Sequence, residues 1–263
     1  MTRLVVKLGG HALDDVGPTS ALLAALAQDL QSLVARGDEV LLVHGGGPQI
    51  ASLLARVGLE SVFHEGLRVT SGETMDYVAM ALASVNLAVV RALTRAGLAC
   101  VGIDGADGSL ITGRSLGAPW DRAATVAAVD PRVVEQLWRG AWVPVVSPVG
   151  VDEGGQLLNC NADVAAGALA GALGAETLVL LSDVDQLRED PDDESSALTH
   201  VSASRVREMI ESGAAREGMR PKMGAALDAL GAGARRVVLA NGTRPHALRD
   251  VLDARVPTTE VVA

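Results

Sequence analysis

The sequence predicts an α/β fold in which helices cover both faces of a mostly parallel sheet. Short apolar runs alternate along the chain with longer segments whose apolar residues recur at helical spacing. The 263 residues are 49% apolar, yet the aromatic ones are only one Phe, one Tyr and three Trp. A core of Ala, Val and Leu suits helices packed closely on a parallel sheet.

The predicted elements follow this alternation in chain order. Strands are expected at residues 4–8, 40–43, 100–103, 142–146, 177–181, 236–240 and 259–262. Helices are expected at residues 20–36, 73–95, 130–139, 162–173, 202–212, 222–230 and 245–254, with one more starting near Pro48. Residues 104–128 are expected to hold a hairpin and residues 188–196 a solvated loop.

Helix boundaries rest on capping residues. Gly37 follows the last periodic residue of the first helix, and Pro48 suits a first helical turn. Asp130 before Pro131 is an N-cap and N1 pair, and Asn161 is expected to cap the helix rich in small residues. In a parallel sheet of this kind, ligands bind beyond the carboxyl ends of the strands.

Charge and composition exclude several functions. The net charge of −10 argues against a nucleic-acid surface. No segment has the pattern of a secretory signal or a membrane span, and Cys100 and Cys160 lack CxxC spacing, so a cytoplasmic protein with reduced thiols is expected. The five histidines show no metal-binding spacing, so no protein-bound metal is expected.

Two lysines stand out because the other basic residues are all arginine. Of 22 basic side chains only Lys7 and Lys222 are lysine. Lysine is a compact point charge, whereas arginine is a broad planar fork. Lys7 comes directly before Gly9 and Gly10, and Lys222 opens a predicted helix. Two point charges beside glycine-rich turns indicate a site for a phosphoryl group in transfer, although chance survival of two surface lysines is the alternative.

Glycine-rich turns follow two of the predicted strands. Gly9 and Gly10 follow the first strand, and Gly45, Gly46 and Gly47 lie between a strand and a helix. Glycines let backbone N–H groups approach an anion closely, and a helix N-terminus favours negative charge. No GxxxxGK[ST] or GxGxxG pattern occurs, which excludes a P-loop enzyme and argues against a nicotinamide cofactor.

Three further polar residues are candidates for the same site. Arg68 precedes the long helix and is able to clamp a carboxylate, although a surface arginine is the simpler interpretation. Asn159 and Asp163 flank the capping Asn161 and have no evident structural duty. We expect the Asp163 carboxylate to pair with both Lys7 and Lys222.

Together these segments resemble the amino acid kinase family, and within it the acetylglutamate kinases, over essentially the whole chain. The matching segments, in the order of the family, are Val6-Lys7-Leu8-Gly9-Gly10, Val43-His44-Gly45-Gly46-Gly47, Gly66-Leu67-Arg68-Val69-Thr70, Glu73-Thr74-Met75-Asp76, Asn159-Cys160-Asn161-Ala162-Asp163, Leu181-Ser182-Asp183-Val184 and Gly218-Met219-Arg220-Pro221-Lys222. The resemblance implies an αβα sandwich with a mostly parallel central sheet of about eight strands. It further implies an acyl-substrate and dimerisation lobe at residues 1–175 and a nucleotide lobe at residues 176–263.

The implied activity is ATP-dependent phosphorylation of the γ-carboxylate of N-acetyl-L-glutamate, with Mg²⁺ carried by the nucleotide. By the resemblance, the catalytic residues are Lys7, Lys222 and Asp163, and the substrate-binding residues are Gly45, Gly46, Arg68 and Asn159. The nucleotide-binding residues are Gly9, Gly10, Ser182, Asp183, Leu187, Arg216 and Met219. Gln186 stands where the family usually has glycine, so the turn beside the nucleotide is expected to differ.

The resemblance also sets expectations for assembly, and it leaves alternatives. The chain begins almost at its first strand, which resembles the shorter, dimeric relatives that arginine does not inhibit. A homodimer is therefore expected, and regulation by a PII-type partner is left open. A kinase acting on carrier-linked α-aminoadipate or glutamate is one alternative. A non-catalytic amino-acid sensor is another, although it would be expected to have lost one of Lys7, Asp163 and Lys222.

Overall fold

The computed structural model describes residues 1–9, 13, 17, 19–190, 192–213 and 219–263. Its strands are β1 (Arg3–Leu8), β2 (Glu39–His44), β3 (Phe63–His64), β4 (Leu67–Arg68), β5 (Cys100–Asp104), β6 (Ile111–Gly117), β7 (Asp121–Val129), β8 (Val143–Ser147), β9 (Val149–Val151), β10 (Leu157–Cys160), β11 (Thr177–Ser182), β12 (Leu187–Arg188), β13 (Ala197–Leu198), β14 (His200–Ser202), β15 (Arg236–Asn241) and β16 (Thr259–Val262). Its α-helices are α1 (Ala21–Ala35), α2 (Gly47–Arg56), α3 (Gly72–Arg95), α4 (Arg132–Arg139), α5 (Ala162–Ala172), α6 (Ala203–Glu211), α7 (Arg220–Gly231) and α8 (Ala247–Leu252). Short 3₁₀ helices lie at Asp107–Ser109 and Glu194–Ser196.

The centre of the molecule is an eight-stranded sheet in the order β14-β16-β15-β11-β1-β2-β8-β5. The six strands from β15 to β5 are parallel, whereas β16 pairs antiparallel with β15 and parallel with β14. The predicted sheet of about eight mostly parallel strands is confirmed. Its central strand β1 is flanked by β11 and β2, so the residues that end these three strands meet at one edge.

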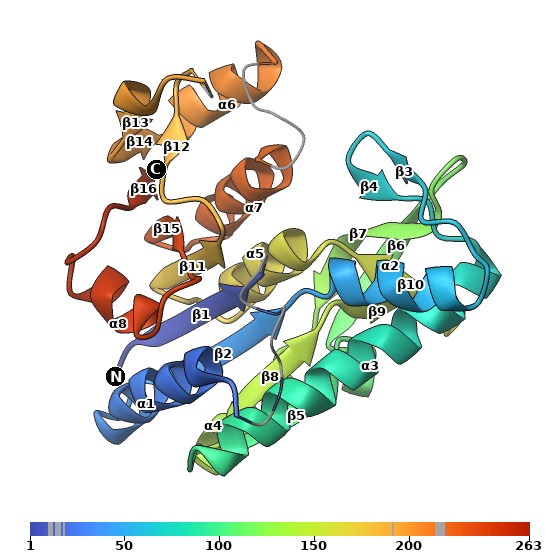
Figure 1. Cartoon of the computed structure of the whole chain (residues 1–263), viewed down its shortest axis with the longest axis horizontal. Coiled ribbons are helices and arrows are strands. Elements are labelled where there is room, and N and C mark those ends of the chain that lie inside the picture. The colour runs from blue at the N-terminus through green and yellow to red at the C-terminus, as the bar shows by residue number, and fades with distance from the viewer. Residues whose placement is uncertain (10–12, 14–16, 18, 191, 214–218) are drawn as a thin grey trace.

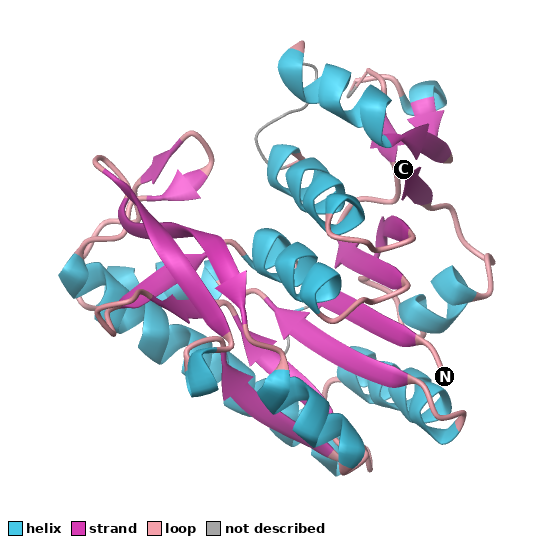
Figure 2. Cartoon of the chain, turned by 180° about the vertical axis from the view of Figure 1, so that it is seen from behind, coloured by secondary structure: helices cyan, strands magenta, loops and turns pink. Residues whose placement is uncertain are grey.

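Helices cover both faces of this sheet, as the αβα prediction requires (Figures 1 and 2). Helices α1 and α3 pack on one face, with α8 against α1, while α4, α5 and α7 pack on the other. Side chains of a strand alternate between the two faces, and β1 shows this clearly. Val5 belongs to the core beside α5 and α7, whereas Val6 and Leu8 belong to the core beside α1 and α3. Lys7, two residues after Val5, therefore faces α5.

Helices α5 and α7 approach each other unusually closely because small residues form the contact. A Cβ on Gly167 would lie 2.7 Å from the carbonyl oxygen of Ala225, and a Cβ on Gly171 would lie 2.2 Å from Cβ of Ala232. Glycine is the residue that permits such an approach of backbones. The separation of the two helices is thus fixed by main-chain contact.

Outside the main sheet, the fold is richer in strands than predicted. The expected hairpin at residues 104–128 exists as β6 and β7, but it forms a closed barrel with β9 and β10. The two-residue strands β3 and β4 form a further hairpin. These strands carry few of the alternating apolar residues by which sequence analysis finds a strand, since much of their surface is exposed.

Several helix boundaries differ from prediction. Helix α4 begins at Arg132 rather than at Pro131, and the Asp130 carboxylate accepts hydrogen bonds from both the backbone and the guanidinium of Arg132. Helix α7 begins at Arg220, two residues earlier than expected, with Pro221 in its first turn. Helix α8 is shorter than expected, at Ala247–Leu252.

Helix α3 is the one described helix that is long and apolar enough to cross a membrane by length and composition alone. It has 24 residues, and nine of them are buried against the sheet and neighbouring helices. Its apolar character therefore serves core packing on one face. The opposite face leaves Met80 and Leu87 exposed.

Candidate active site

The candidate site begins with Lys7, near the end of β1. This residue is 5% exposed, and its side chain faces α5. A Cβ on Gly9 would lie only 2.1 Å from Nζ of Lys7, so the ammonium group occupies the space that a larger residue at position 9 would fill. The N–H of Gly9 donates to the carbonyl oxygen of Leu181, which ties this turn to β11. Glycine at position 9 is thus required for the placement of Lys7.

Asp163 lies in the first turn of α5, opposite Lys7. Asn161 caps this helix by accepting hydrogen bonds from the N–H groups of Asp163 and Val164, as predicted. The two oxygens of the buried Asp163 carboxylate contact the two lysines separately, with Lys7 Nζ at 2.8 Å from Oδ1 and Lys222 Nζ at 3.0 Å from Oδ2. The predicted convergence of these three residues is confirmed.

The electrostatics of this cluster follow from burial and pairing. Burial lowers the pKa of Lys7, an effect that the nearby Asp163 carboxylate opposes. For Asp163, burial alone would raise the pKa, but Lys7 and Lys222 together hold it below its ordinary value. Two ammonium groups share one carboxylate, so the cluster has a formal charge of +1 and favours an additional anion.

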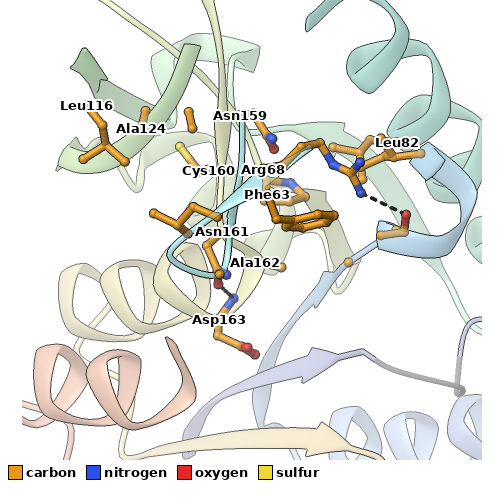
Figure 3. A pocket seen from close by; sticks show the side chains of 18 of the residues that line it. Phe63, Arg68, Leu82, Leu116, Ala124, Asn159, Cys160, Asn161, Ala162 and Asp163 are labelled. Carbon is orange, nitrogen blue, oxygen red and sulfur yellow. Dashed lines mark hydrogen bonds between the residues drawn. The ribbon is translucent and has the colours of Figure 1, made fainter. Parts of the chain in front are cut away.

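The cluster opens into a cavity of about 210 Å³ between α5, the turn after β2, and the β3–β4 hairpin (Figure 3). Asp163 lies at one end, and Arg68 and Asn159 line the opposite side. Lys7, which also lines the cavity, contacts Asp163. Backbone groups of Gly45 and Gly46 line the wall between them. The remaining lining residues include Phe63, Leu82, Leu116, Ala124, Cys160 and Ala162. The cavity thus combines a cationic end with apolar walls.

Arg68 is buried and already bonded to the protein. Its guanidinium donates to the carbonyl oxygen of Gly47 at 3.2 Å and to the hydroxyl oxygen of Ser61, and it lies 4.7 Å from the ring centre of Phe63. Burial lowers its pKa from the ordinary value. The simpler interpretation, an ordinary surface arginine, is therefore wrong. Arg68 is a buried cation held at the wall of the cavity.

Asn159 is the second-last residue of β10 and lies on the same side of the cavity. Its Nδ2 donates to Oγ1 of Thr70 at 3.0 Å, and the Thr70 hydroxyl in turn donates to the carbonyl oxygen of Arg68 at 2.9 Å. This chain of hydrogen bonds links Asn159 to the segment that carries Arg68. The two predicted substrate residues are thereby held together.

The β3–β4 hairpin is fastened above the cavity by Trp120. Its indole Nε1 donates to the carbonyl oxygen of His64 at 3.0 Å, and the two rings lie 5.0 Å apart between centres. Thr70 also bridges to Asp121 at the start of β7. The hairpin is therefore attached to the β6–β7 segment.

The predicted nucleotide residues that the structure describes do not line the cavity. Ser182 ends β11 and is buried. Asp183 is exposed, and its charge partly opposes the lowering of the Lys7 pKa by burial. The Leu187 side chain belongs to the core, and its N–H donates to the Thr259 hydroxyl. Met219 precedes α7 and packs against the same core. Gly10 and Arg216 lie outside the described residues, so their roles stay predictions.

Gln186, the departure from the family pattern, bonds away from the cluster. Its Nε2 donates to the carbonyl oxygens of Thr258 and Leu198, at 3.0 and 3.5 Å. The side chain therefore ties the segment after β11 to the strands at the edge of the sheet. A glycine at this position would lack these contacts.

Sequence analysis missed the apolar residues of the cavity. Phe63 and Leu116 lie in segments where the spacing of apolar residues did not predict a helix or strand. Cys160 was expected only to be a reduced thiol. A signal was available for two of them, because Cys160 lies between Asn159 and Asn161, and Phe63, the one phenylalanine, lies close to Arg68. Burial raises the pKa of Cys160 to about 11, so its thiol is neutral in the cavity.

Nothing in the described part of the chain forms a cage for a metal. No group of three or more His, Cys, Asp or Glu side chains is close enough together there to hold an ion. The buried carboxylate nearest the cavity, Asp163, is already engaged by two ammonium groups.

The sequence and the fold are similar to those of known proteins. The family model described as "Amino acid kinase family" matches residues 2–241. The acetylglutamate kinase of Symbiobacterium thermophilum is 40% identical, over 93% of this chain and 86% of that protein. The solved N-acetylglutamate synthase of Neisseria gonorrhoeae, complexed with coenzyme A and N-acetyl-glutamate, is 25% identical with a TM-score of 0.83. That alignment covers 100% of this chain and 59% of the synthase.

A carbamate kinase from Giardia shares the fold at 16% identity, with a TM-score of 0.72 over 99% of this chain and 98% of that one. The family model thus spans nearly all of the chain, and its match includes Lys7, Asp163 and Lys222. This chain belongs to the amino acid kinase family.

Proposed function

We propose that this chain transfers the γ-phosphoryl group of ATP to the γ-carboxylate of N-acetyl-L-glutamate, the reaction of an acetylglutamate kinase. The products are ADP and N-acetyl-L-glutamyl 5-phosphate, and the reaction is the second step of arginine synthesis. The observation that carries this proposal is the Lys7–Asp163–Lys222 cluster at the end of a cavity that also presents Arg68 and Asn159. The acetylglutamate kinases that are about 40% identical support the choice of acyl substrate.

The reaction requires positioning and charge neutralisation more than proton transfer. A carboxylate is ionised at neutral pH and serves as the nucleophile without a general base. One of its oxygens attacks the γ-phosphorus, the bond to the β,γ-bridging oxygen breaks, and its electron pair stays on ADP. Charge spreads over the phosphoryl oxygens during this transfer, so cations and N–H groups fixed around them lower the barrier.

The three charged residues of the cluster each have a defined part in this scheme. Lys7 lies beside the turns at Gly9 and Gly45, where it would neutralise the transferring group. Lys222 would follow the leaving oxygen of ADP, and Asp163 holds both ammonium groups at a fixed separation. Mg²⁺ would be held by the phosphates of ATP and would neutralise part of their charge.

On this proposal the chain divides by task. Residues 1–175 bind the acyl substrate, and residues 176–263 bind the nucleotide through Ser182, Asp183 and the start of α7.

A coupled assay of ADP release tests the proposal. Purified protein would be supplied with MgATP and either N-acetyl-L-glutamate, L-glutamate or an N-acylated α-aminoadipate. Rapid turnover with N-acetyl-L-glutamate alone is expected. Preference for the aminoadipate compound would instead favour the carrier-linked alternative, and binding without turnover of any substrate would favour the sensor.

Removing Arg68 is expected to weaken binding of the acyl substrate selectively. Arg68→Ala should raise KM for N-acetyl-L-glutamate by about tenfold to a hundredfold, because a charge-assisted hydrogen bond is worth roughly 1.5–3 kcal/mol. KM for ATP should change by less than about threefold. Steady-state kinetics with each substrate varied in turn measures both. Equal increases in both constants would place Arg68 outside the acyl site.

We also propose a homodimer formed through the exposed face of α3. Met80 and Leu87 are each 60% exposed, and Ala83 and Ser84 lie between them on the same face. Large apolar side chains on a face of small residues permit close packing against a second copy.

Charge on this face is expected to break the dimer. Leu87→Glu should shift the protein from about 54 to about 27 kDa in light scattering, because it places like charges opposite each other across a two-fold axis. Trp142→Glu is the control, because Trp142 is an exposed apolar residue outside α3. It should leave the mass unchanged. An unchanged mass for Leu87→Glu would exclude α3 as the interface.

A further inference from the structure

A buried polar cluster lies directly beneath the Gly45–Gly47 turn and has no part in the scheme above. His44 ends β2 and is completely buried, and Asn86 lies on the buried face of α3. Nδ2 of Asn86 lies 3.0 Å from Nε2 of His44 and 2.9 Å from the carbonyl oxygen of Val145. On the other side of the ring, Nδ1 of His44 lies 2.8 Å from the carbonyl oxygen of Gly45.

The direction of each hydrogen bond in this cluster follows from its neighbours. The Val145 carbonyl can only accept, so the amide nitrogen of Asn86, not its oxygen, faces it. The same NH₂ group then donates its second proton to Nε2 of His44, which must accept. A neutral ring that accepts at Nε2 carries its proton on Nδ1, and this proton is donated to Gly45. Burial, which lowers the pKa of His44 to about 4, keeps the ring neutral.

The sheet makes room for this arrangement. A Cβ on Gly102 of β5 would lie 1.9 Å from Oδ1 of Asn86, so no residue larger than glycine fits there while Asn86 keeps its position. Gly46 is similarly confined, because a Cβ there would lie 2.8 Å from Cδ2 of Leu82. Strands β2, β5 and β8 and helix α3 thus all contribute to one buried support for the turn.

The support determines which way the Gly45–Gly46 peptide faces. In a planar trans peptide the C=O of one residue and the N–H of the next point to opposite sides. The Gly45 carbonyl is held toward the buried His44 ring, so the N–H of Gly46 points the other way, and Gly46 lines the cavity. Among the described residues, no hydrogen bond engages the N–H of Gly46 or of Gly47. Glycine peptides rotate more easily than others, so this orientation needs an anchor.

We propose that His44 and Asn86 are positioning residues, which hold the Gly45 carbonyl so that the N–H of Gly46 is presented to the phosphoryl group in transfer. This inference rests on the proposed function for the identity of the anion. The hydrogen-bond order within the cluster does not depend on it.

Three substitutions of His44 separate positioning from packing. His44→Asn keeps a donor near the place of Nδ1, His44→Gln keeps an acceptor near the place of Nε2 for Asn86, and His44→Leu keeps neither. Loss of a positioned donor typically costs about 100-fold in kcat, so the kcat of His44→Gln and of His44→Leu should fall by roughly that factor. His44→Asn should stay within about fivefold of the parent, with KM for ATP little changed in all three. Equal losses of kcat in the three variants would assign the cluster to folding alone.

A control distinguishes loss of a buried hydrogen bond from loss of the anchor. Asn86→Leu should lower kcat by about tenfold or more, because His44 and Val145 both lose their donor. Gln31→Leu removes a comparable bond, from Nε2 to the carbonyl oxygen of Ala96 at 3.1 Å, beside the other end of α3. It should lower thermal stability without changing kcat. The same fall in kcat for both variants would overturn the proposal.

The proton position can be measured in the parent protein without any substrate. With ¹⁵N-labelled histidine, one of the five imidazoles should remain neutral and protonated at Nδ1 between about pH 6 and about pH 8, and its signals should vanish in His44→Asn. Protonation at Nε2, or a charged ring, would overturn the assigned hydrogen-bond order. An inactive parent protein with the expected proton position would instead overturn the proposed function and uphold that order.

Discussion

Replacing Lys7 by arginine is expected to lower kcat by about 100-fold to 1,000-fold while the protein stays folded. Arginine keeps the positive charge but needs more space than lysine. The space is confined, since Nζ of Lys7 lies 2.8 Å from Asp163 and 2.1 Å from the position of a Cβ on Gly9. A planar guanidinium does not fit that space, so a cation is displaced from the transferring group at a cost of ~3–4 kcal/mol in transition-state stabilisation. Steady-state kinetics measures kcat, and circular dichroism measures folding.

The control for this substitution lies on the same strand. Arg3 begins β1 and bonds Glu39 and the carbonyl oxygen of Leu173, far from the cavity. Arg3→Lys should change stability slightly and leave kcat as it is. A Lys7→Arg enzyme with nearly normal kcat would refute the role proposed for Lys7.

Asp163→Asn is expected to remove activity and to destabilise the protein. Lys7 and Lys222 would then share a buried site with no counter-charge, and breaking a buried ion pair on one side typically costs ~3–5 kcal/mol. Lys7, whose pKa burial already lowers, would lose its proton more readily, so any remaining activity should be greater at about pH 6 than at about pH 9. Denaturant titration and a pH–rate profile measure the two effects.

The stabilisation by Asp163 is also expected to depend on pH. The pKa of Asp163 is lowered in the folded protein, so its contribution is fully present above the ordinary carboxylate pKa of 3.8 and is lost as pH falls below it. The difference in unfolding free energy between the parent and Asp163→Asn should therefore shrink in acid. Asp29→Asn is the matched control, since this equally buried carboxylate bonds His246 and the N–H of Arg249. It should lose stability but keep kcat.

Much of the main sheet was predictable because its strands are short, apolar and buried on both faces. Strand β11 is buried at every position, and helix α3 differs from its predicted start by one residue. The barrel of β6, β7, β9 and β10 was not predictable in full, since its pairing joins segments with exposed and small residues. Tertiary pairing, rather than local preference, determines such strands.

The charged cluster was predictable for a different reason. Lys7 and Lys222 were marked by the scarcity of lysine, and Asp163 by its place after a capping Asn161. The buried support at His44 and Asn86 could not be found in this way, although Asn86 is a polar residue between Val85 and Val89 on the buried face of α3. A polar residue on an apolar helix face indicates a buried partner, but only the fold identifies that partner.

The attachment of the β3–β4 hairpin through Trp120 also makes intrinsic fluorescence a probe of one part of this protein. All five aromatic side chains lie between Phe63 and Trp142, so residues 176–263 contribute no intrinsic fluorescence. Trp138 is buried and Trp142 lies on the surface, whereas Trp120 bonds the hairpin at the edge of the cavity. A variant that retains Trp120 as its one tryptophan would emit mainly from the side proposed to bind the acyl substrate. Its emission during turnover would report on that side and not on the side proposed to bind the nucleotide.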